Sequence, residues 1–232
     1  MRAIFDHVAP RYDLMNDLMS FGTHRLWKRE MVAILNPQRG QRLVDVAGGT
    51  GDIAFLSLPR LLPEGSGGAV GAVVCDASEK MLAVGRERAL DRGVLCGIEW
   101  VCADALALPL RDKSADLYTN GFGLRNVTRI GGALSEAYRV LRPGGRFLAL
   151  EFTPQVAPVL QAPYDFYSFQ VLPLIGEIVA GNRDAYLYLA DSIRRFPSQS
   201  ALTEMIAAAG LERVKFRNLM GGVAALYSAW RL

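Results

Sequence analysis

The sequence predicts an α/β fold in which a mostly parallel sheet carries helices on both of its faces. Short apolar runs of strand type alternate with helical patterns through residues 41–153. A glycine-rich turn lies between the first of these runs and the helix that follows it. Hydrophobic residues make up 51% of the 232 and charged residues 21%, which is enough for one domain with a buried core. Such alternation is typical of parallel strands joined by crossover helices.

Local patterns define the individual elements. In residues 1–40, apolar residues recur at three- and four-residue steps, as Leu26, Met31 and Ile34 do, which predicts helix. Asn36-Pro37 ends this stretch, because proline lacks an amide hydrogen and restricts the residue before it. We expect strands at 42–47, 69–75, 98–102, 116–122 and 146–152, and helices at 50–62, 78–91 and 130–141.

The rest of the chain completes one domain. Prolines, aromatic residues and a helix-like stretch predict a helical cap insertion at 154–196. A helix at 200–209 precedes strands at 211–217 and 222–230, whose short connection predicts an antiparallel pair at one edge of a seven-stranded sheet. We therefore expect a single domain, 1–232, made of an N-terminal helical lid (1–40), a cofactor-binding half (41–153), the cap (154–196) and a C-terminal helix with edge strands (197–232).

Composition excludes several classes of protein. The net charge is +3 with no block of five like charges, so we expect no nucleic-acid partner. The longest uncharged runs have 13 residues, whereas a membrane-spanning helix needs roughly 20. The N-terminus has no apolar core of the signal-peptide type. Cys75, Cys96 and Cys102 form no Cys-x-x-Cys pair, so we expect buried free thiols in a reducing compartment and no metal site.

The glycine-rich turn at 45–52 (DVAGGTGD) is the sharpest local feature. It falls at the carboxyl edge of the predicted sheet, where doubly wound folds bind ligands. Asp76 ends the second predicted strand, where a carboxylate can accept both hydroxyls of a ribose; a helix-capping role is the alternative. Asp104-Ala105 follows the third strand, where an acidic residue can meet an adenine amino group; a solvated turn is the alternative.

The residues in and near the glycine-rich turn indicate which type of nucleotide it would bind. A phosphate-binding Walker loop requires a lysine, and residues 47–52 contain none. The spacing of the glycines in 49–54 is compatible with a dinucleotide-binding loop, although the sequence has no Tyr-x-x-x-Lys pair for hydride transfer. S-adenosylmethionine carries no phosphate and has a cationic ammonium group, which Asp45 at the start of the turn can attract.

Longer stretches of the sequence resemble one particular family. The chain resembles the ubiquinone/menaquinone-biosynthesis C-methyltransferases of the UbiE type, class I methyltransferases with a Rossmann-like fold. The resemblance covers nearly the whole chain. It is carried by 8–20, 24–28, 47–52 (AGGTGD), 122–128 (FGLRNVT), 138–146, 167–169 and 192–199 (SIRRFPSQ).

The resemblance implies S-adenosylmethionine as cofactor and C-methylation of a polyprenylated benzoquinol, naphthoquinol or both; 192–197 and 230–232 look closer to the ubiquinone branch. The chain departs from the family at 76–78, at 104–106, at Gly121, where Ser or Ala is usual, and at 227–229. With the turn and strand ends, the cofactor residues expected are Asp45, Gly48, Gly49, Thr50, Gly51, Asp76, Asp104, Ala105 and Gly121.

Methylation of an aromatic carbon needs a sink for the charge or proton of a neighbouring phenol. Arg125 and Asn126 follow the fourth strand, and the resemblance assigns catalysis to this pair, with the Tyr12 hydroxyl in the pocket. Arg125 can stabilise a phenolate, and Asn126 can orient the oxygen. The alternative is that Arg125 pairs with an acid such as Asp13 and ties the N-terminal helix to the sheet. His24 is the alternative base, if it does not merely cap or pack.

The resemblance also bears on partners. The aromatic cap (Tyr164, Phe166, Tyr167, Phe169 and 172–179) is expected to hold the polyprenyl tail, with core packing as the alternative. We expect a cytoplasmic enzyme, peripheral at the inner membrane of a bacterium or on the matrix side in a mitochondrion. Other quinone-biosynthesis proteins and a second copy of the chain are candidate partners. A non-catalytic scaffold for quinone biosynthesis, or a methyltransferase for another small aromatic, remain the competing functions.

Overall fold

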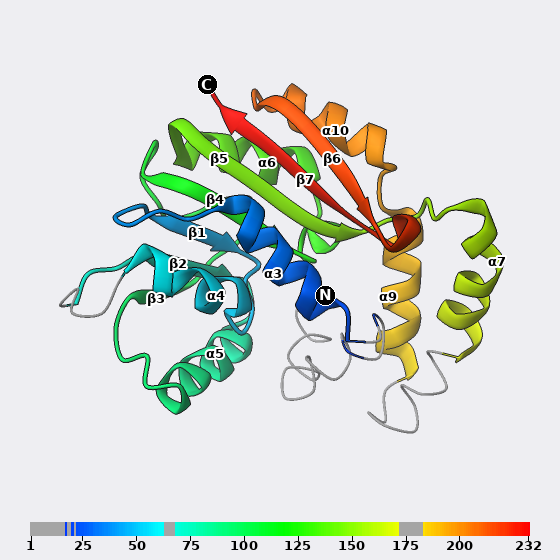
Figure 1. Cartoon of the computed structure of the whole chain (residues 1–232), viewed down its shortest axis with the longest axis horizontal. Coiled ribbons are helices and arrows are strands. Elements are labelled where there is room, and N and C mark those ends of the chain that lie inside the picture. Colours follow the sequence, from blue (N-terminus) through cyan, green and yellow to red (C-terminus); the bar gives the residue numbers. More distant parts are fainter. Residues whose placement is uncertain (1–16, 18–19, 21, 63–67, 172–182) are drawn as a thin grey trace.

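A seven-stranded sheet forms the centre of the molecule (Figure 1). The computed structural model describes residues 17, 20, 22–62, 68–171 and 183–232. The strand order is β3-β2-β1-β4-β5-β7-β6, with β7 antiparallel to both of its neighbours. The strands are β1 (Leu43–Val46), β2 (Ala72–Asp76), β3 (Ile98–Cys102), β4 (Ala115–Gly121), β5 (Leu141–Phe152), β6 (Glu212–Leu219) and β7 (Ala224–Arg231). The predicted α/β class, strand number and antiparallel edge pair are thus confirmed.

Helices cover both faces of the sheet. Side chains of α3, α4 and α5 pack with one face in a core that includes Trp27, Ile53 and Leu82. Side chains of α6 and α10 pack on the other face in a core that includes Leu134 and Leu202. Figure 1 shows α7 and α9 beyond one end of the sheet. The helices are α3 (His24–Leu35), α4 (Asp52–Leu61), α5 (Glu79–Asp91), α6 (Ile130–Val140), α7 (Pro158–Phe166), α9 (Arg183–Arg195) and α10 (Gln199–Ala208).

Capping residues explain several boundaries. The α3 helix ends at Leu35, where Asn36 adopts a left-handed conformation with φ of 50°, and Pro37 follows. Ser78 begins α5, because its hydroxyl accepts a hydrogen bond from the Met81 amide. Residues 1–16, 18, 19 and 21 of the predicted N-terminal helical region lie outside the described residues.

Two expectations are corrected. The sequence predicts a helix to 141 and a strand only from 146, but α6 ends at Val140 and β5 begins at Leu141. A register shift lets β5 accommodate the Pro-Gly-Gly segment, since Ala115 pairs with Leu141 and Leu117 pairs with Arg146. Cys75 is buried as expected, but Cys96 and Cys102 are exposed because they lie before and at the end of the edge strand β3.

Parallel pairing brings the ends of β1, β2, β3 and β4 to one edge. Asp45 is in register with Val74 of β2 and Thr119 of β4, and Asp76 is in register with Cys102 of β3. The loops that leave these strands therefore meet at the same place. Within the parts of the chain that the structure describes, no helix is long and apolar enough to cross a membrane.

Candidate functional site

A cavity of about 390 Å³ lies at this carboxyl edge. Its wall comes from the loops after four neighbouring strands and from the start of α5. Each loop contributes residues that the sequence singled out or that lie beside them. They include Ala47 and Gly49 after β1, Asp76 and Ser78 after β2, Asp104 and Ala105 after β3, and Phe122, Gly123 and Asn126 after β4.

The Asp76 carboxylate is held in place by two backbone amides at the cavity. The Gly49 N–H donates to Oδ2 at 2.9 Å, and the Ser78 N–H donates to Oδ1 at 2.8 Å. A carboxylate oxygen can accept more than one hydrogen bond, so both oxygens keep capacity for a ligand hydroxyl. This is the arrangement that a ribose diol requires, and it joins the glycine turn to the end of β2.

The glycine turn needs small residues for physical reasons at two positions. A Cβ at Gly48 would lie 2.8 Å from Oδ2 of Asp45 and 2.8 Å from Cγ1 of Val74. Gly51 has φ of 83° and precedes α4, where a Cβ would lie 2.6 Å from the Trp100 ring. The turn can therefore pass close over β1 and β2 only without side chains at these positions.

Asp45 lies beneath the turn and is not part of the cavity wall. Its side chain is fully buried, and Oδ1 accepts a hydrogen bond from the Thr119 hydroxyl at 2.7 Å. Oδ2 has no hydrogen-bond partner among the described residues. Burial raises the pKa of Asp45 to about 7, although the Thr119 hydrogen bond and the Lys28 charge oppose the shift.

Asn120 connects the two loops that form the floor of the site, and sequence reasoning missed it. Its amide nitrogen donates to the Val46 carbonyl at 2.9 Å, and its oxygen accepts from the Gly123 N–H at 3.1 Å. Ala47 and Phe122, which follow β1 and β4 directly, both have positive φ, 52° and 60°. Such backbone is strained for residues other than glycine, so Asn120 helps to hold the two loops in place.

Thr50 and the first residue of α4 belong to a network on the outer side of the turn. Asp52 accepts a hydrogen bond from Lys28 Nζ at 2.7 Å and from Arg88 Nη2 at 2.8 Å, and Arg88 also donates to the Thr50 hydroxyl. Thr50 and Gly51 are absent from the cavity wall. In this arrangement they shape the turn and do not face the cavity.

Arg125 is absent from the wall of this cavity, and its side chain pairs within the protein. Its Nη1 donates to Glu151 Oε2 at 3.0 Å and to the Phe122 carbonyl. Burial raises the pKa of Glu151, and the Arg125 charge opposes this rise. The acid that pairs with Arg125 is Glu151, at the end of β5; Asp13, the acid named as an example from the sequence, lies outside the described residues. A single acid in the otherwise apolar run 147–152 was the signal for it in the sequence.

Asn126 lies next to Arg125 in a short turn (Leu124–Asn126) and lines the cavity. Its Oδ1 is buried, and no partner for it exists among the described residues. A buried carboxamide oxygen without a partner is costly unless a ligand or water completes it. Asn126 is therefore the member of the predicted pair that lines this cavity, although Arg125 Nε is also buried without a partner among the described residues.

The other predicted cofactor residues differ in their position. Asp104 and Ala105 line the cavity, and Oδ1 of Asp104 accepts the Leu106 N–H at 2.9 Å. Gly121 is absent from the wall, and a Cβ there would lie 2.7 Å from Ile53 Cδ1. Gly121 therefore leaves room for Ile53 of α4.

Several expected residues cannot be placed at the cavity. Tyr12 lies outside the described residues, as do 172–179. His24 is buried and bonds Asp17 at 2.8 Å; burial, together with the Lys28 charge, lowers its pKa. In the cap, Tyr164 and Tyr167 are half-buried, whereas Phe166 is 64% exposed.

The cavity fits S-adenosylmethionine on its own geometry. Asp76 and Asp104 offer carboxylates to hydroxyl and amino groups, and the unpartnered Asn126 oxygen offers a further acceptor. No lysine or arginine lines the cavity wall in the described part of the chain, which suits a cofactor without phosphate. The described residues bring no cluster together that could hold a metal ion.

The family model for the ubiE/COQ5 methyltransferase family matches residues 1–231. The chain belongs to this family. It is 53% identical to the ubiquinone/menaquinone biosynthesis C-methyltransferase UbiE of Dinoroseobacter shibae, with 100% of this chain and 90% of that protein covered. It is 52% identical to the protein of the same name in Brucella abortus, with 99% and 84% covered.

Solved structures confirm the fold. A methyltransferase of Thermotoga maritima, described as a possible histamine N-methyltransferase, has a TM-score of 0.68 at 20% identity, with 99% of both chains covered. The [4+2]-cyclase SpnF has a TM-score of 0.71 at 17% identity, with 99% of this chain and 94% of that chain covered. The fold is that of class I methyltransferases, and membership of the family makes S-adenosylmethionine the cofactor.

Proposed function

We propose that this ubiE/COQ5 family member methylates a ring carbon of a polyprenylated quinol in ubiquinone biosynthesis, menaquinone biosynthesis or both. The supporting observation is the Asn126 carboxamide, whose buried oxygen is unpartnered on the same wall as Asp76 and the glycine turn. A quinol hydroxyl can donate the hydrogen bond that this oxygen lacks.

The residues of the chain have distinct roles in this proposal. When bound, S-adenosylmethionine supplies an electrophilic methyl group that an electron-rich ring carbon can take up. Asp76, Asp104 and the backbone at Gly49 hold and orient the cofactor. Asn126 Oδ1 accepts a hydrogen bond from the phenol hydroxyl next to the reacting carbon, which orients the ring and raises the electron density at that carbon.

We assign Arg125 a positioning role. Through Glu151 and the Phe122 carbonyl it holds the turn that carries Asn126. An arginine cannot act as an ordinary base, because its pKa stays above about 12. Tyr12 remains part of the proposal on the resemblance alone, as do Asp45, Gly48, Thr50, Gly51 and Gly121 as residues that shape the cofactor site.

The test is direct. The purified protein is incubated with labelled S-adenosylmethionine and a panel of demethoxy-benzoquinols and demethylmenaquinols, and the products are identified by mass spectrometry. We expect one added methyl group on a ring carbon. Transfer to oxygen, or binding of cofactor with no product from any quinol, contradicts the proposal; the latter outcome would favour the scaffold.

We further propose that the protein is peripheral at the cytoplasmic side of a bacterial inner membrane, because a polyprenyl tail partitions into lipid. The exposed side chains Val159 and Phe166 of α7 are candidates for contact with that tail. Sedimentation with liposomes that contain the quinone tests the association, and light scattering tests whether the chain forms a homodimer. Failure to sediment with these liposomes contradicts the membrane proposal.

A further inference from the structure

A second cavity, of about 140 Å³, opens between α3, α4 and α5. Among the eight described residues that line it, five are arginine or lysine and one, Asp52, is acidic. None of these residues lines the larger cavity. The two cavities therefore have different chemistry: the larger one presents carboxylates and the smaller one presents cations.

The single carboxylate of the small cavity is fully used. Asp52 accepts hydrogen bonds from Lys28 and Arg88 at 2.7 and 2.8 Å. Burial raises its pKa, but the charges and hydrogen bonds of Lys28 and Arg88 outweigh this and lower it to about 2. Only 8% of the Lys28 side chain is exposed. The floor of the cavity is thus a hydrogen-bonded group in which Lys28 and Arg88 share the Asp52 carboxylate.

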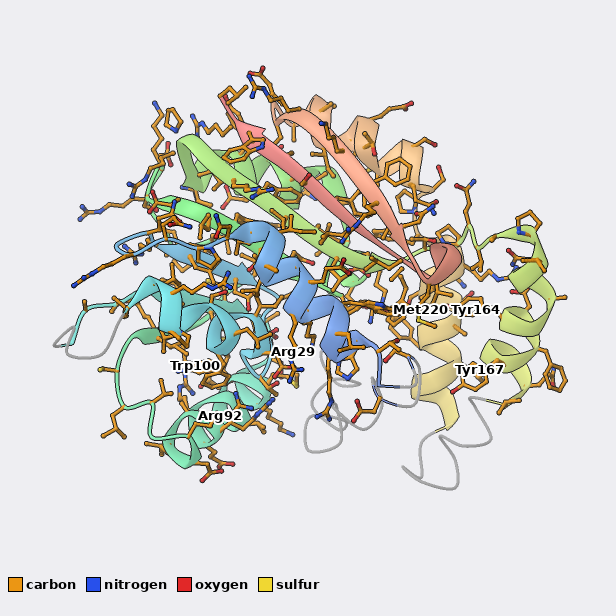
Figure 2. The ribbon with its side chains drawn as sticks, in the orientation of Figure 1. Arg29, Arg92, Trp100, Tyr164, Tyr167 and Met220 are labelled. Carbon is orange, nitrogen blue, oxygen red and sulfur yellow. The ribbon has the colours of Figure 1, made fainter. Side chains whose placement is uncertain are left out.

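Arg29 of α3 and Arg92, just after α5, also line this cavity, and both are labelled in Figure 2. Neither has a carboxylate partner among the described residues. The Arg92 guanidinium lies over the Phe55 ring at 4.5 Å. Stacking uses the face of a guanidinium, so its N–H groups keep their donors in the plane.

The cavity therefore has an excess of positive charge. Arg25 is neutralised by Asp17, to which it donates at 3.0 and 2.6 Å. Lys28 and Arg88 share one negative charge, and Arg29 and Arg92 add two more positive charges. His24 adds none at neutral pH, because burial and the Lys28 charge lower its pKa.

We propose that this cavity is a binding site for a phosphate group, carried either by an anionic lipid headgroup or by a soluble phosphate compound. Planar guanidinium groups from two sides can each give paired hydrogen bonds to phosphate oxygens, and Lys28 supplies a point charge below them. Leu56 in the wall is 36% exposed, so an apolar portion of a ligand would also find a contact. The inference goes beyond methyl transfer and does not depend on the identity of the quinol.

The test compares two charge-matched double variants. Arg29→Gln with Arg92→Gln removes the two unpaired guanidinium groups, whereas Arg39→Gln with Arg60→Gln removes two exposed arginines that do not line this cavity. One arm measures sedimentation with phosphatidylcholine vesicles with and without phosphatidylglycerol. The other arm measures binding of inorganic phosphate and pyrophosphate by calorimetry. Melting temperature and S-adenosylmethionine affinity are recorded for every variant.

We expect the Arg29/Arg92 variant to bind the phosphate ligand roughly 30-fold more weakly, at about 1 kcal/mol per basic residue, with the control almost unchanged. Loss in the vesicle arm identifies a lipid headgroup, and loss in the calorimetric arm alone identifies a soluble phosphate. Equal weakening in both double variants, or no binding in either arm by the native protein, overturns the proposal. A loss of cofactor affinity in the Arg29/Arg92 variant also overturns it, because the cavity would then belong to the cofactor site. Turnover with detergent-dispersed quinol should be retained, so this test and that of the proposed function can fail separately.

Discussion

Arg125 and Glu151 form a buried ion pair of 3.0 Å, with side chains that are 1% and 0% exposed. The pair joins the turn after β4 to the end of β5, and the rings of Phe122 and Phe152 lie 6.0 and 5.6 Å from the guanidinium carbon. Removal of one partner from such a pair leaves an uncompensated buried charge, whereas removal of both need not. This asymmetry separates a structural role of Arg125 from a catalytic one.

Substitution of the pair should uncouple stability from turnover. We expect Arg125→Met to cost about 3–5 kcal/mol of unfolding free energy, because Glu151 loses its partner. Arg125→Met with Glu151→Leu should recover much of that stability but leave turnover per folded molecule low, because Asn126 is no longer held. Arg125→Lys keeps the charge but loses the planar guanidinium. Its stability and turnover should therefore lie between those of the native protein and those of Arg125→Met. Melting temperature, cofactor affinity and turnover are measured together; normal turnover in the folded double variant would remove Arg125 from the mechanism.

Asn126→Ala should act on turnover and not on folding. Its oxygen has no partner among the described residues, so its loss removes no contact that the structure shows. If it orients the reacting phenol, turnover should fall roughly 10²-fold, as for loss of one group that acts on the transition state. Cofactor affinity by calorimetry should remain close to that of the native protein. A variant with native turnover would contradict the assignment.

Asp76→Ala should weaken cofactor binding by about 2–3 kcal/mol, because charge-assisted hydrogen bonds to the ribose are lost. The Gly49 amide also loses its acceptor, so the glycine turn becomes less ordered. Glu87→Ala, at an exposed position of α5, is the matched control and should leave affinity unchanged. Calorimetry decides: an unchanged affinity for S-adenosylmethionine, or tighter binding of NAD, would refute the assignment of Asp76.

Two glycines offer a matched test of the close approach between the loops. A Cβ at Gly123 would collide with the Ala47 Cβ and lie 3.0 Å from the Asn120 amide, whereas a Cβ at Gly131 in α6 meets nothing within 4 Å. We expect Gly123→Ala to cost about 1–3 kcal/mol of stability and to weaken cofactor binding. Gly131→Ala should be neutral or stabilise by up to about 1 kcal/mol. Equal melting temperatures for the two variants would contradict this account of the floor.

Asp45 should give the protein a characteristic pH dependence. Its folded pKa, about 7, is raised above the ordinary value of 3.8, so the folded state binds this proton more tightly than the unfolded state. The contribution of Asp45 to stability is therefore full below about pH 4, is lost as pH rises to about 7, and stays constant above. Asp45→Asn should gain stability relative to the native protein across this window. Urea unfolding at several pH values measures the difference; a difference that does not change with pH would contradict the raised pKa.

Local sequence patterns were sufficient to predict most of the strands and the sheet edge at which the cavity lies. Apolar runs with 45–52, Asp76 and 104–105 at their ends predicted both the strands and the edge where the cavity lies. Parallel pairing guarantees that consecutive strand ends meet, so residues that follow them must be neighbours. The Pro-Gly-Gly segment made the prediction of β5 too short. Such a segment usually ends a strand, but here a shift in strand register accommodates it within β5.

Only the tertiary structure decided which side chains line the cavity. Arg125 and Asn126 are adjacent in sequence, yet one turns to Glu151 and the other lines the cavity. The pairings of Lys28 with Asp52, of Asn120 with the Val46 carbonyl and of Asp45 with Thr119 likewise join distant segments. A periodic pattern reports which face of an element is buried, but a buried polar group takes whichever partner packing brings within about 3 Å. The sequence by itself thus determined the fold and the place of the site, and long-range packing determined the role of each polar residue in it.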